Sequence, residues 1–400
     1  MNLELIAHTK AIMGQIEKLE VLDHIALTSA KGGLALYYAY AYQILSEEEA
    51  IDKCHENVGT CLEYIGNQSM DTSLSDGITG LGWLLAHLIE NELIEIEGAE
   101  FMNVFDEQIF KSFETDIETG NYDLLYGLIG KGQYFLQRSS AGDFEKALLQ
   151  VVEMLAQMSE KTDTGITWPD RFTHKHLANP QVKYNLGLSH GVPSIITFLA
   201  KVAKKGIARK QCLELIESSL PWLLGQQTEK HYSRFPHFSD EKEPSRLGWS
   251  YGDLGVAIAV WNAARVTERF DLEATALDLV TIACDRTLDN SHSYVLKDGT
   301  PDISLCTGAS GIALIFNNFY QTTGISMFKQ SRDYWHQITM EHLWRLTEMD
   351  THAYDDMSFT PWYSDPGLLN GMAGIGLSIM ALESEMPAPW QSLFLTDLIS

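Results

Sequence analysis

The chain is short of basic residues, and this deficit limits its partners. Its 400 residues include 28 lysines and arginines against 54 aspartates and glutamates, a formal net charge of −26. Nucleic acids and anionic membrane surfaces bind positive protein surfaces, so the composition argues against both as partners. A surplus of acidic residues of this kind mainly keeps a protein soluble.

Cysteines and long apolar segments are also scarce. An odd and widely spread set of cysteines is not a disulfide framework and suits a reducing compartment. No apolar run reaches the roughly 18 residues that a membrane span requires. Glu4, His8 and Lys10 interrupt the N-terminal segment, which therefore lacks the apolar core of a signal peptide. We expect a cytoplasmic protein. Its five cysteines are Cys54, Cys61, Cys212, Cys284 and Cys306.

Glycine, in contrast, is plentiful and recurs in a fixed pattern. A small residue, two variable residues, a second small residue and an apolar segment are repeated along the chain. Glycine permits close backbone approaches that a side chain would block. Each interval between copies is long enough for two helices and their loops. The seven copies begin at Ala30, Gly77, Gly127, Gly191, Gly252, Gly308 and Gly371, at intervals of 47, 50, 64, 61, 56 and 63 residues.

Amphipathic segments lie between the apolar ones and carry most of the charge. Their apolar residues recur every three or four positions, which predicts outer helices with one solvated face. The segments after the glycines are apolar nearly all round and predict covered, inner helices. Strand patterns are sparse. The clearest amphipathic segments are Glu47 to Ile65, Asp143 to Met158, Lys210 to Leu224 and Phe270 to Thr287.

The repeat therefore predicts an all-α fold, an (α/α)7 toroid forming a single domain over residues 1–400. Seven inner and seven outer helices, closed into a ring, would bring the glycine-rich turns to one end. The polar residues beside those glycines would then line a common cavity.

The motifs around the glycines, in their order and combination, resemble those of the lanthionine synthetase C-like (LanC-like) cyclases. That family has an α/α toroid fold, in agreement with the repeat. The resemblance extends through most of the chain. The motifs are Ser75–Gly80, Tyr122–Gly127, Asn185–Gly191, Arg246–Gly252, Leu305–Gly308 and Gly367–Gly371.

The resemblance implies a reaction of lantibiotic biosynthesis. Members of the family typically add a cysteine thiol of a ribosomally made precursor peptide to dehydroalanine or dehydrobutyrine, which closes a thioether ring. The thiol has to become a thiolate, and the resulting enolate has to be stabilised and then protonated at carbon. The implied partners are a precursor peptide and a lantibiotic-type dehydratase.

The resemblance also implies the site residues. His190 matches the family's acid/base histidine and Asp123 its carboxylate. Arg246 and Tyr251 match the cationic and phenolic groups of the catalytic set. We predict a substrate-binding role for the residues at and beside the family's metal-ligand positions, namely Trp249, Ser250, Cys306 and Thr307.

At the zinc ligands the chain departs from the family. The family uses the cysteine of Trp-Cys-Tyr-Gly and both ligands of Cys-His-Gly, whereas here Ser250 and Thr307 replace two of the three. Neutral hydroxyls are poor zinc ligands, and a zinc site needs at least three protein ligands. We therefore expect no cofactor. Loop histidines that could stand in as ligands are His174, His176, His231 and His237, but such residues are common on surfaces.

Two functions remain open, a zinc-independent thioether cyclase and a catalytically degenerate protein that binds or scaffolds the precursor peptide or the dehydratase. The retained His190, Asp123 and Arg246 favour the first function. The losses at Ser250 and Thr307 favour the second. A serine hydrolase is disfavoured although Gly248–Gly252 fits Gly-x-Ser-x-Gly, because that motif needs a preceding strand. The cysteines of the outer helices and the tyrosines between Tyr37 and Tyr40 are predicted core residues.

Overall fold

The structure is a computed structural model. It describes residues 3–19, 25–65, 71–94, 101–139, 144–171, 183–228, 232–293, 299–345 and 361–400. These residues are mainly helical, as predicted. The α-helices are α1 (Leu3–Ile16), α2 (Lys31–Leu45), α3 (Glu48–Ile65), α4 (Ile78–Glu90), α5 (Met102–Lys111), α6 (Phe113–Thr119), α7 (Leu128–Arg138), α8 (Glu145–Met158), α9 (Val192–Lys204), α10 (Arg209–Leu224), α11 (Asp253–Thr267), α12 (Phe270–Ala283), α13 (Ala309–Thr323), α14 (Ser326–Arg345) and α15 (Met372–Glu383). Two short 3-10 helices are η3 (Trp362–Ser364) and η4 (Pro389–Phe394).

The repeat predicted from the sequence sets the starts of the inner helices. Helices α2, α4, α7, α9, α11, α13 and α15 each begin one residue after the first small residue of a copy. The outer helices α3, α8, α10 and α12 agree with the predicted amphipathic segments to within a few residues. In the described part of the chain, none of the helices is long and apolar enough to cross a membrane.

In the six copies that begin with glycine, the turn is too crowded for a side chain at that glycine, whereas the first copy begins with Ala30. A Cβ on Gly191 would lie 2.2 Å from the carbonyl oxygen of Asn185, and one on Gly371 would lie 2.1 Å from that of Asp365. The same two carbonyls accept from the first N–H of α9 and of α15, at 3.0 and 2.8 Å. The turn therefore closes on the helix N-terminus and satisfies a donor that has no partner inside the helix.

A second feature of the turns escaped the sequence analysis. Six residues before the first glycine, an aspartate or asparagine accepts from the backbone N–H two residues further on, an Asx turn. The bond measures 2.9 Å from Gly187 to Asn185 and 2.8 Å from Ser304 to Asp302. The residues in this position are Asp71, Asn121, Asn185, Asp302 and Asp365.

The turn before α11 is the exception among the described Asx positions, because Arg246 stands there in place of an Asx residue. Its first glycine, Gly252, has a φ of +96°, whereas Gly191 has an extended φ of −123°. A positive φ is a conformation that glycine adopts readily and other residues rarely. The turn thus relies on this glycine where the others use an Asx residue.

One element was not expected. Strands β1 (Glu160–Thr162) and β2 (Gly165–Thr167) form an antiparallel hairpin. Each strand has three residues, which is too short to show the alternation by which a strand is recognised in a sequence. The hairpin packs against α10.

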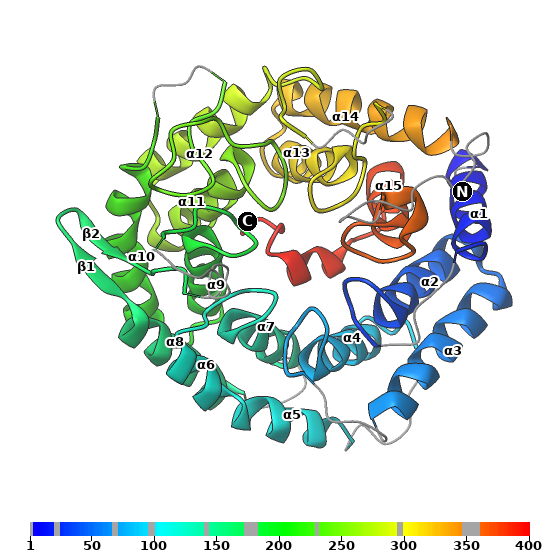
Figure 1. Ribbon diagram of the computed structural model, residues 1–400, viewed down its shortest axis with the longest axis horizontal. Helices are drawn as coiled ribbons and strands as arrows, with labels where there is room; N and C mark the ends of the chain where they lie inside the picture. The colour runs from blue at the N-terminus through cyan, green and yellow to red at the C-terminus, as the bar shows by residue number, and fades with distance from the viewer. Residues whose placement is uncertain are drawn as a thin grey trace. The chain divides into compact units, whose positions relative to one another are not determined.

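The chain divides into two compact units, which are described separately. Unit 1 comprises residues 1–103, 293–317 and 329–388, and unit 2 comprises residues 104–292, 318–328 and 389–400. In unit 1, α2 packs against α3, α4 and α15 (Figure 1). In unit 2, α9 packs against α7, α10 and α11, and α11 packs against α12 (Figure 1). The prediction of one domain over residues 1–400 stays a prediction.

The C-terminal segment of unit 2 is tied to its inner helices. The indole Nε1 of Trp261 on α11 donates to the carbonyl of Ile399 at 3.0 Å. The side chain of Gln133 on α7 donates to the carbonyl of Ser392 at 2.6 Å.

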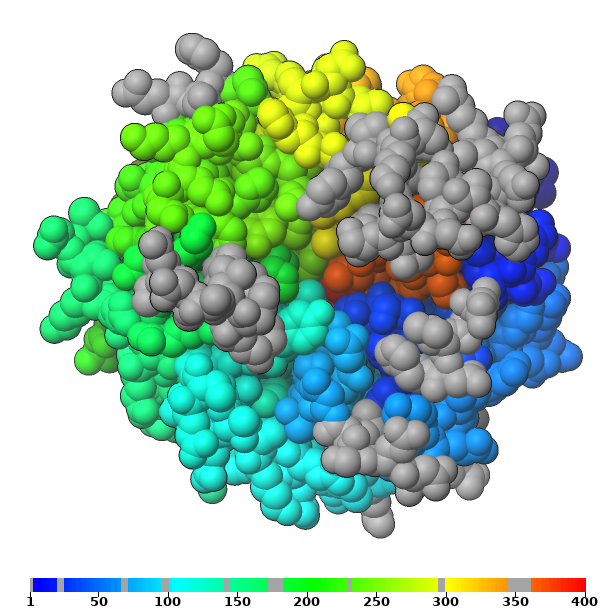
Figure 2. Space-filling view, viewed as in Figure 1, coloured from blue at the N-terminus to red at the C-terminus, as the bar shows by residue number. Residues whose placement is uncertain are grey.

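Apart from the atoms drawn in grey, the cyan and green residues of unit 2 form a continuous surface on the face shown in Figure 2.

An ion pair is buried between two helices of unit 2. Lys131 of α7 is 1% exposed, and its Nζ lies 2.5 Å from a carboxylate oxygen of Asp116 on α6. An exposed counterpart is the pair Lys111–Glu107, whose side chains are 75% and 73% exposed.

We expect Lys131→Met to lower the free energy of unfolding by about 3–5 kcal/mol, because it removes the cation from a buried carboxylate. Lys111→Met is the matched control and should change stability little. Adding Asp116→Leu to Lys131→Met should recover most of the loss. Chemical denaturation followed by circular dichroism measures all three, and equal effects of the two lysine substitutions would contradict the expectation.

Candidate active site

Three turns of unit 2 present one residue each in the same structural position. Tyr126, His190 and Tyr251 each stand directly before the glycine that precedes α7, α9 or α11. Each is partly exposed, whereas the residue on either side of it is buried. The rings of Tyr126 and His190 are nearly parallel, at 6° and with centroids 6.4 Å apart. The repeat thus brings together residues that are far apart in the sequence.

His190 and Asp123, both predicted site residues, form a hydrogen-bonded pair. The Nδ1 atom of His190 lies 2.6 Å from Oδ2 of Asp123. The other carboxylate oxygen of Asp123 accepts from the backbone N–H groups of Leu125 and Tyr126, at 2.7 and 2.9 Å. With three donors, the carboxylate has a fixed position, and Nε2 is left as the ring nitrogen that can exchange a proton with a substrate.

The electrostatic environment favours the protonated form of His190. Burial lowers the pKa of His190, but the charge and hydrogen bond of Asp123, together with the charge of Asp170, outweigh it. The pKa consequently lies above the usual 6.5. The side chain of His190 is 22% exposed and that of Asp123 3%. A partly accessible histidine with a raised pKa can serve as both acid and base near neutral pH.

Tyr251 is held by a residue that the sequence analysis did not single out. The side-chain Nδ2 of Asn185 donates to the hydroxyl of Tyr251 at 3.3 Å and to Oδ2 of Asp170 at 3.1 Å. Burial raises the pKa of Tyr251 to about 12, despite the hydrogen bond from Asn185 and the charge of Arg246. The phenol is therefore neutral near pH 7 and can donate a proton in a hydrogen bond.

Arg246 lies over the Tyr251 ring, with its guanidinium carbon 5.4 Å from the ring centroid. The Nε of Arg246 donates to Nε2 of His237 at 3.5 Å. Burial, together with the charges of Arg246 and His292, lowers the pKa of His237 to about 4. His237 is thus a neutral acceptor that helps to orient Arg246.

Two further predicted residues of the same turn are buried. Trp249 is 2% exposed, and its indole Nε1 donates to the carbonyl of Phe394 at 2.8 Å. Ser250 is 5% exposed, and its hydroxyl has no hydrogen-bond partner among the described residues. The carbonyl of Ser250 accepts from the hydroxyl of Ser189 at 3.1 Å, which ties this turn to the one that carries His190.

The last two predicted residues, Cys306 and Thr307, belong to unit 1. The backbone N–H of Cys306 donates to the carbonyl of Leu369 at 2.9 Å, and the residue is partly exposed. Thr307 is 5% exposed, and its hydroxyl donates to the carboxylate of Asp302. Because the units are described separately, the substrate-binding roles of these two residues stay predictions.

The donor set does not fit the family's zinc ion. Where the family has two thiolates and an imidazole, this chain offers one thiol and two neutral hydroxyls, and the hydroxyl of Thr307 already donates to Asp302. Zinc requires at least three strong ligands. Of the histidines considered as replacements, His237 contacts Arg246 instead, and His174, His176 and His231 lie outside the described residues. Within the described ranges, no three His, Cys, Asp or Glu side chains are placed to hold a metal ion.

The remaining candidates belong to the core or are unsuited to catalysis. Gly248–Gly252 lies between helices, and the described strands are confined to residues 160–167, so the nucleophile elbow is absent from the described chain. Burial raises the pKa of the thiols of Cys54, Cys61 and Cys212 to about 12 in each case. These three thiols are inert core groups, as predicted, whereas Cys284, also predicted as a core residue, is partly exposed. Tyr37, Tyr38 and Tyr40 are buried as well.

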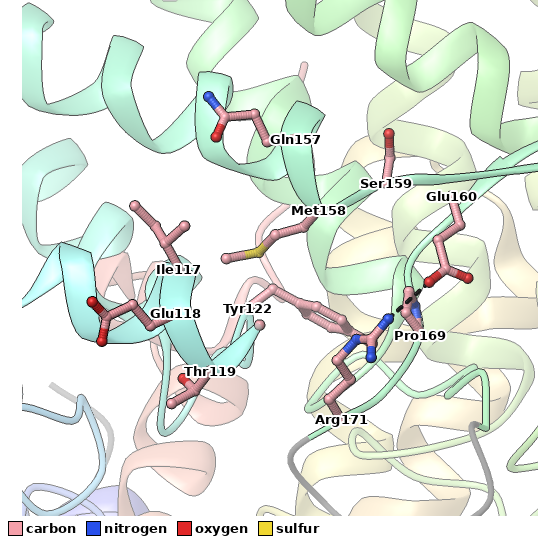
Figure 3. A pocket seen from close by; sticks show the side chains of 11 residues that line it. Ile117, Glu118, Thr119, Tyr122, Gln157, Met158, Ser159, Glu160, Pro169 and Arg171 are labelled. Carbon is pink, nitrogen blue, oxygen red and sulfur yellow. Dashed lines mark hydrogen bonds and ion pairs between the residues drawn. The ribbon is translucent and has the colours of Figure 1, made fainter.

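An open cleft of about 520 Å³ lies beside Tyr122, the neighbour of Asp123 (Figure 3). It is bordered by the C-terminal ends of α6 and α8 and by the segment 169–171. Figure 3 shows the ion pair between Arg171 and Glu160, 2.9 Å long, at one side of it. None of the predicted site residues lines this cleft.

Comparisons with known proteins agree with these features. A family model described as "Lanthionine synthetase C-like protein" matches residues 26–395. The structure is similar to that of a nisin cyclase, with a TM-score of 0.75 and 15% identity, over 98% of this chain and 96% of that one. This likeness confirms the predicted fold class, an all-α (α/α)7 toroid. No curated protein sequence matched the chain significantly.

We expect Asp123→Asn to lower the pKa of His190. The substitution removes the charge of Asp123, so that of these two carboxylates only Asp170 still opposes the effect of burial. Asparagine keeps an oxygen for the N–H groups of Leu125 and Tyr126, so the turn should persist. The raised pKa stabilises the folded protein fully below pH 6.5, and this contribution is lost as the pH rises through the folded-state value. The variant should therefore lose more stability at pH 6 than at pH 9.

Histidine NMR titrations measure this shift directly. Asp271→Asn, which removes a fully exposed carboxylate of α12, is the control and should leave the His190 titration unchanged. Equal titration midpoints in the wild type and Asp123→Asn would show that the pair does not set the pKa of His190.

Proposed function

Because this chain belongs to the lanthionine synthetase C-like family, we propose that it closes thioether rings in a ribosomally made precursor peptide. A cysteine thiol adds to dehydroalanine or dehydrobutyrine. The observation that carries the proposal is the pair His190–Asp123, in which a fixed carboxylate raises the pKa of a partly exposed imidazole. A protein that only held a peptide would not require this arrangement.

His190 serves as both base and acid. In its neutral form, Nε2 takes the proton of the cysteine thiol, and the thiolate forms a bond to the β-carbon of the alkene. The electron pair of the double bond moves toward the carbonyl oxygen and gives an enolate. Nε2 then returns the proton to the α-carbon. The thiol proton thus ends on carbon, and no oxidant or further reactant is consumed.

Arg246 and Tyr251 stabilise the charge that develops on the enolate oxygen. The neutral phenol donates a hydrogen bond, and the guanidinium supplies a positive charge beside the same ring. Donors that are fixed before the reaction contribute most in a site from which water is partly excluded. Each of the two residues is oriented by a hydrogen bond, Tyr251 by the one from Asn185 and Arg246 by the one to His237.

The reaction proceeds without zinc. A free thiol with a pKa near 8.5 is about 3% thiolate at pH 7, so full ionisation would raise the reactive fraction by only ~30-fold. A histidine base and a nearby guanidinium recover part of this factor. The donor set of Ser250, Cys306 and Thr307 supports the proposal.

The substrate chemistry indicates the partner and the place. Dehydroalanine and dehydrobutyrine arise by loss of water from serine and threonine, so a dehydratase has to act first on the same peptide. We place both steps in the cytoplasm. The competing function, in which the protein only binds or scaffolds the peptide or the dehydratase, is favoured by the commitment of the Thr307 hydroxyl to Asp302.

We expect His190→Ala to slow ring closure of a dehydrated precursor peptide by about 100- to 10,000-fold, the usual contribution of a general acid–base group. Loss of free thiol over time, with mass spectrometry of alkylated samples, measures the rate. His55→Ala, on the exposed face of α3, is the control and should be as active as the wild type. If the wild type and His190→Ala both react no faster than buffer, the protein is a binder.

A further inference from the structure

We propose that Asn185 is a positioning residue that fixes the direction of the Tyr251 hydroxyl, so that its proton points to the substrate. This inference rests on the proposed function and adds to it a residue that contacts no substrate atom. It is carried by the hydrogen bonds on both ends of the Asn185 amide and by a comparison of equivalent turns within the chain.

Both ends of the Asn185 amide are assigned by their partners. Its Oδ1 accepts from the backbone N–H of Gly187 at 2.9 Å, and its Nδ2 faces a carboxylate oxygen of Asp170 at 3.1 Å. An N–H can donate only through nitrogen, and a carboxylate can only accept, so the amide has one orientation. Asn185 is fully buried, with 0% exposure.

This orientation decides the role of the Tyr251 hydroxyl. The second N–H of Nδ2 donates to the phenolic oxygen at 3.3 Å, so that oxygen is an acceptor on the Asn185 side. Its own proton has to point elsewhere. In the described part of the chain, no other group is hydrogen-bonded to this hydroxyl. The remaining direction is the partly exposed side of the ring, where an enolate oxygen would accept the proton.

The packing around Tyr251 leaves little freedom for the ring. A Cβ on Gly187 would lie 2.8 Å from Cδ1 and 2.9 Å from Cε1 of Tyr251, so the turn that carries Asn185 contacts the ring directly. His237 packs edge-on against the ring, with centroids 4.8 Å apart. The ring is thus fixed by packing, and the hydroxyl by Asn185.

Equivalent turns separate the structural role of the residue from its role at the site. Asp71, Asp302 and Asp365 occupy the same position in other turns and make the same Asx bond through Oδ1. Aspartate is therefore compatible with the fold at this position. Only an amide also supplies the N–H groups that donate to the Tyr251 hydroxyl and to the Asp170 carboxylate. Asn185→Asp keeps the turn and removes the donor.

The experiment follows ring closure in a synthetic peptide with one dehydroalanine and one cysteine, and 19F NMR of protein carrying Tyr251→3-fluorotyrosine. We expect Asn185→Asp to reduce kcat by about 10- to 100-fold with little change in KM, the range for a lost hydrogen bond to a charged group. The 19F signal should shift, and the fluorophenol should ionise at higher pH. Asp71→Asn is the matched control, an Asx exchange in a unit 1 turn, and should change neither readout.

Two further variants make the outcome decisive. Tyr251→Phe and Asn185→Asp together should be no slower than Tyr251→Phe alone, because Asn185 acts only through the Tyr251 hydroxyl, which Tyr251→Phe already removes. Should the repulsion of two carboxylates unfold Asn185→Asp, the exchange Asn185→Asp with Asp170→Asn keeps the charge and restores the pair, and it should still be slow and shifted in 19F NMR. Additive rate losses, or an unchanged 19F titration, would overturn the proposal. If the wild type does not close rings, the proposed function fails, and the 19F titration alone decides the role of Asn185.

Discussion

The structure depends on the lack of space at the glycine that begins six of the seven turns. In the turns of Gly77, Gly127, Gly191 and Gly371, the carbonyl six residues earlier approaches the glycine so closely that no Cβ fits, and the same carbonyl accepts from the first N–H of the inner helix. Each turn is therefore a closed loop of fixed length that ends in a helix. Because the loop has the same geometry in these copies, equivalent positions within one unit are presented in the same way.

The equivalent positions of the turns carry the residues of the candidate site. The residue directly before the glycine is partly exposed at Tyr126, His190 and Tyr251, and likewise at Asp76 and Asn370 in unit 1, whereas Thr307 before Gly308 is buried. The residue at this position differs from one copy to the next, so it can supply the proposed acid/base in one turn and the phenol in another. The turn before α11 differs further, since Arg246 replaces the Asx residue and Gly252 takes a positive φ. In this turn, an arginine whose guanidinium lies over the ring of Tyr251 occupies the position of the Asx residue.

The sequence predicted the helices and part of the site for a physical reason. Glycine and apolar periodicity act locally, so the seven inner helices and the outer helices α3, α8, α10 and α12 could be placed before the structure was known. The family resemblance implied His190 and Asp123 as site residues, but only the structure shows their hydrogen bond. Asn185 and His237 could not be found in this way, because their roles arise from contacts between turns. The Asx residues could have been recognised in the sequence as an Asp or Asn six positions before the glycine, but this pattern was not used.

The account's central claim is that this site closes thioether rings without a metal ion. The most direct test is ring closure in heavy water by protein of measured zinc content, with a chelator present and the configuration of the α-carbon determined. We predict well under one equivalent of zinc, an undiminished rate, and deuterium delivered to one face of the α-carbon, since a fixed His190 is the donor. One equivalent of bound zinc with a rate that the chelator abolishes, or a product of mixed configuration at the background rate, would contradict the claim.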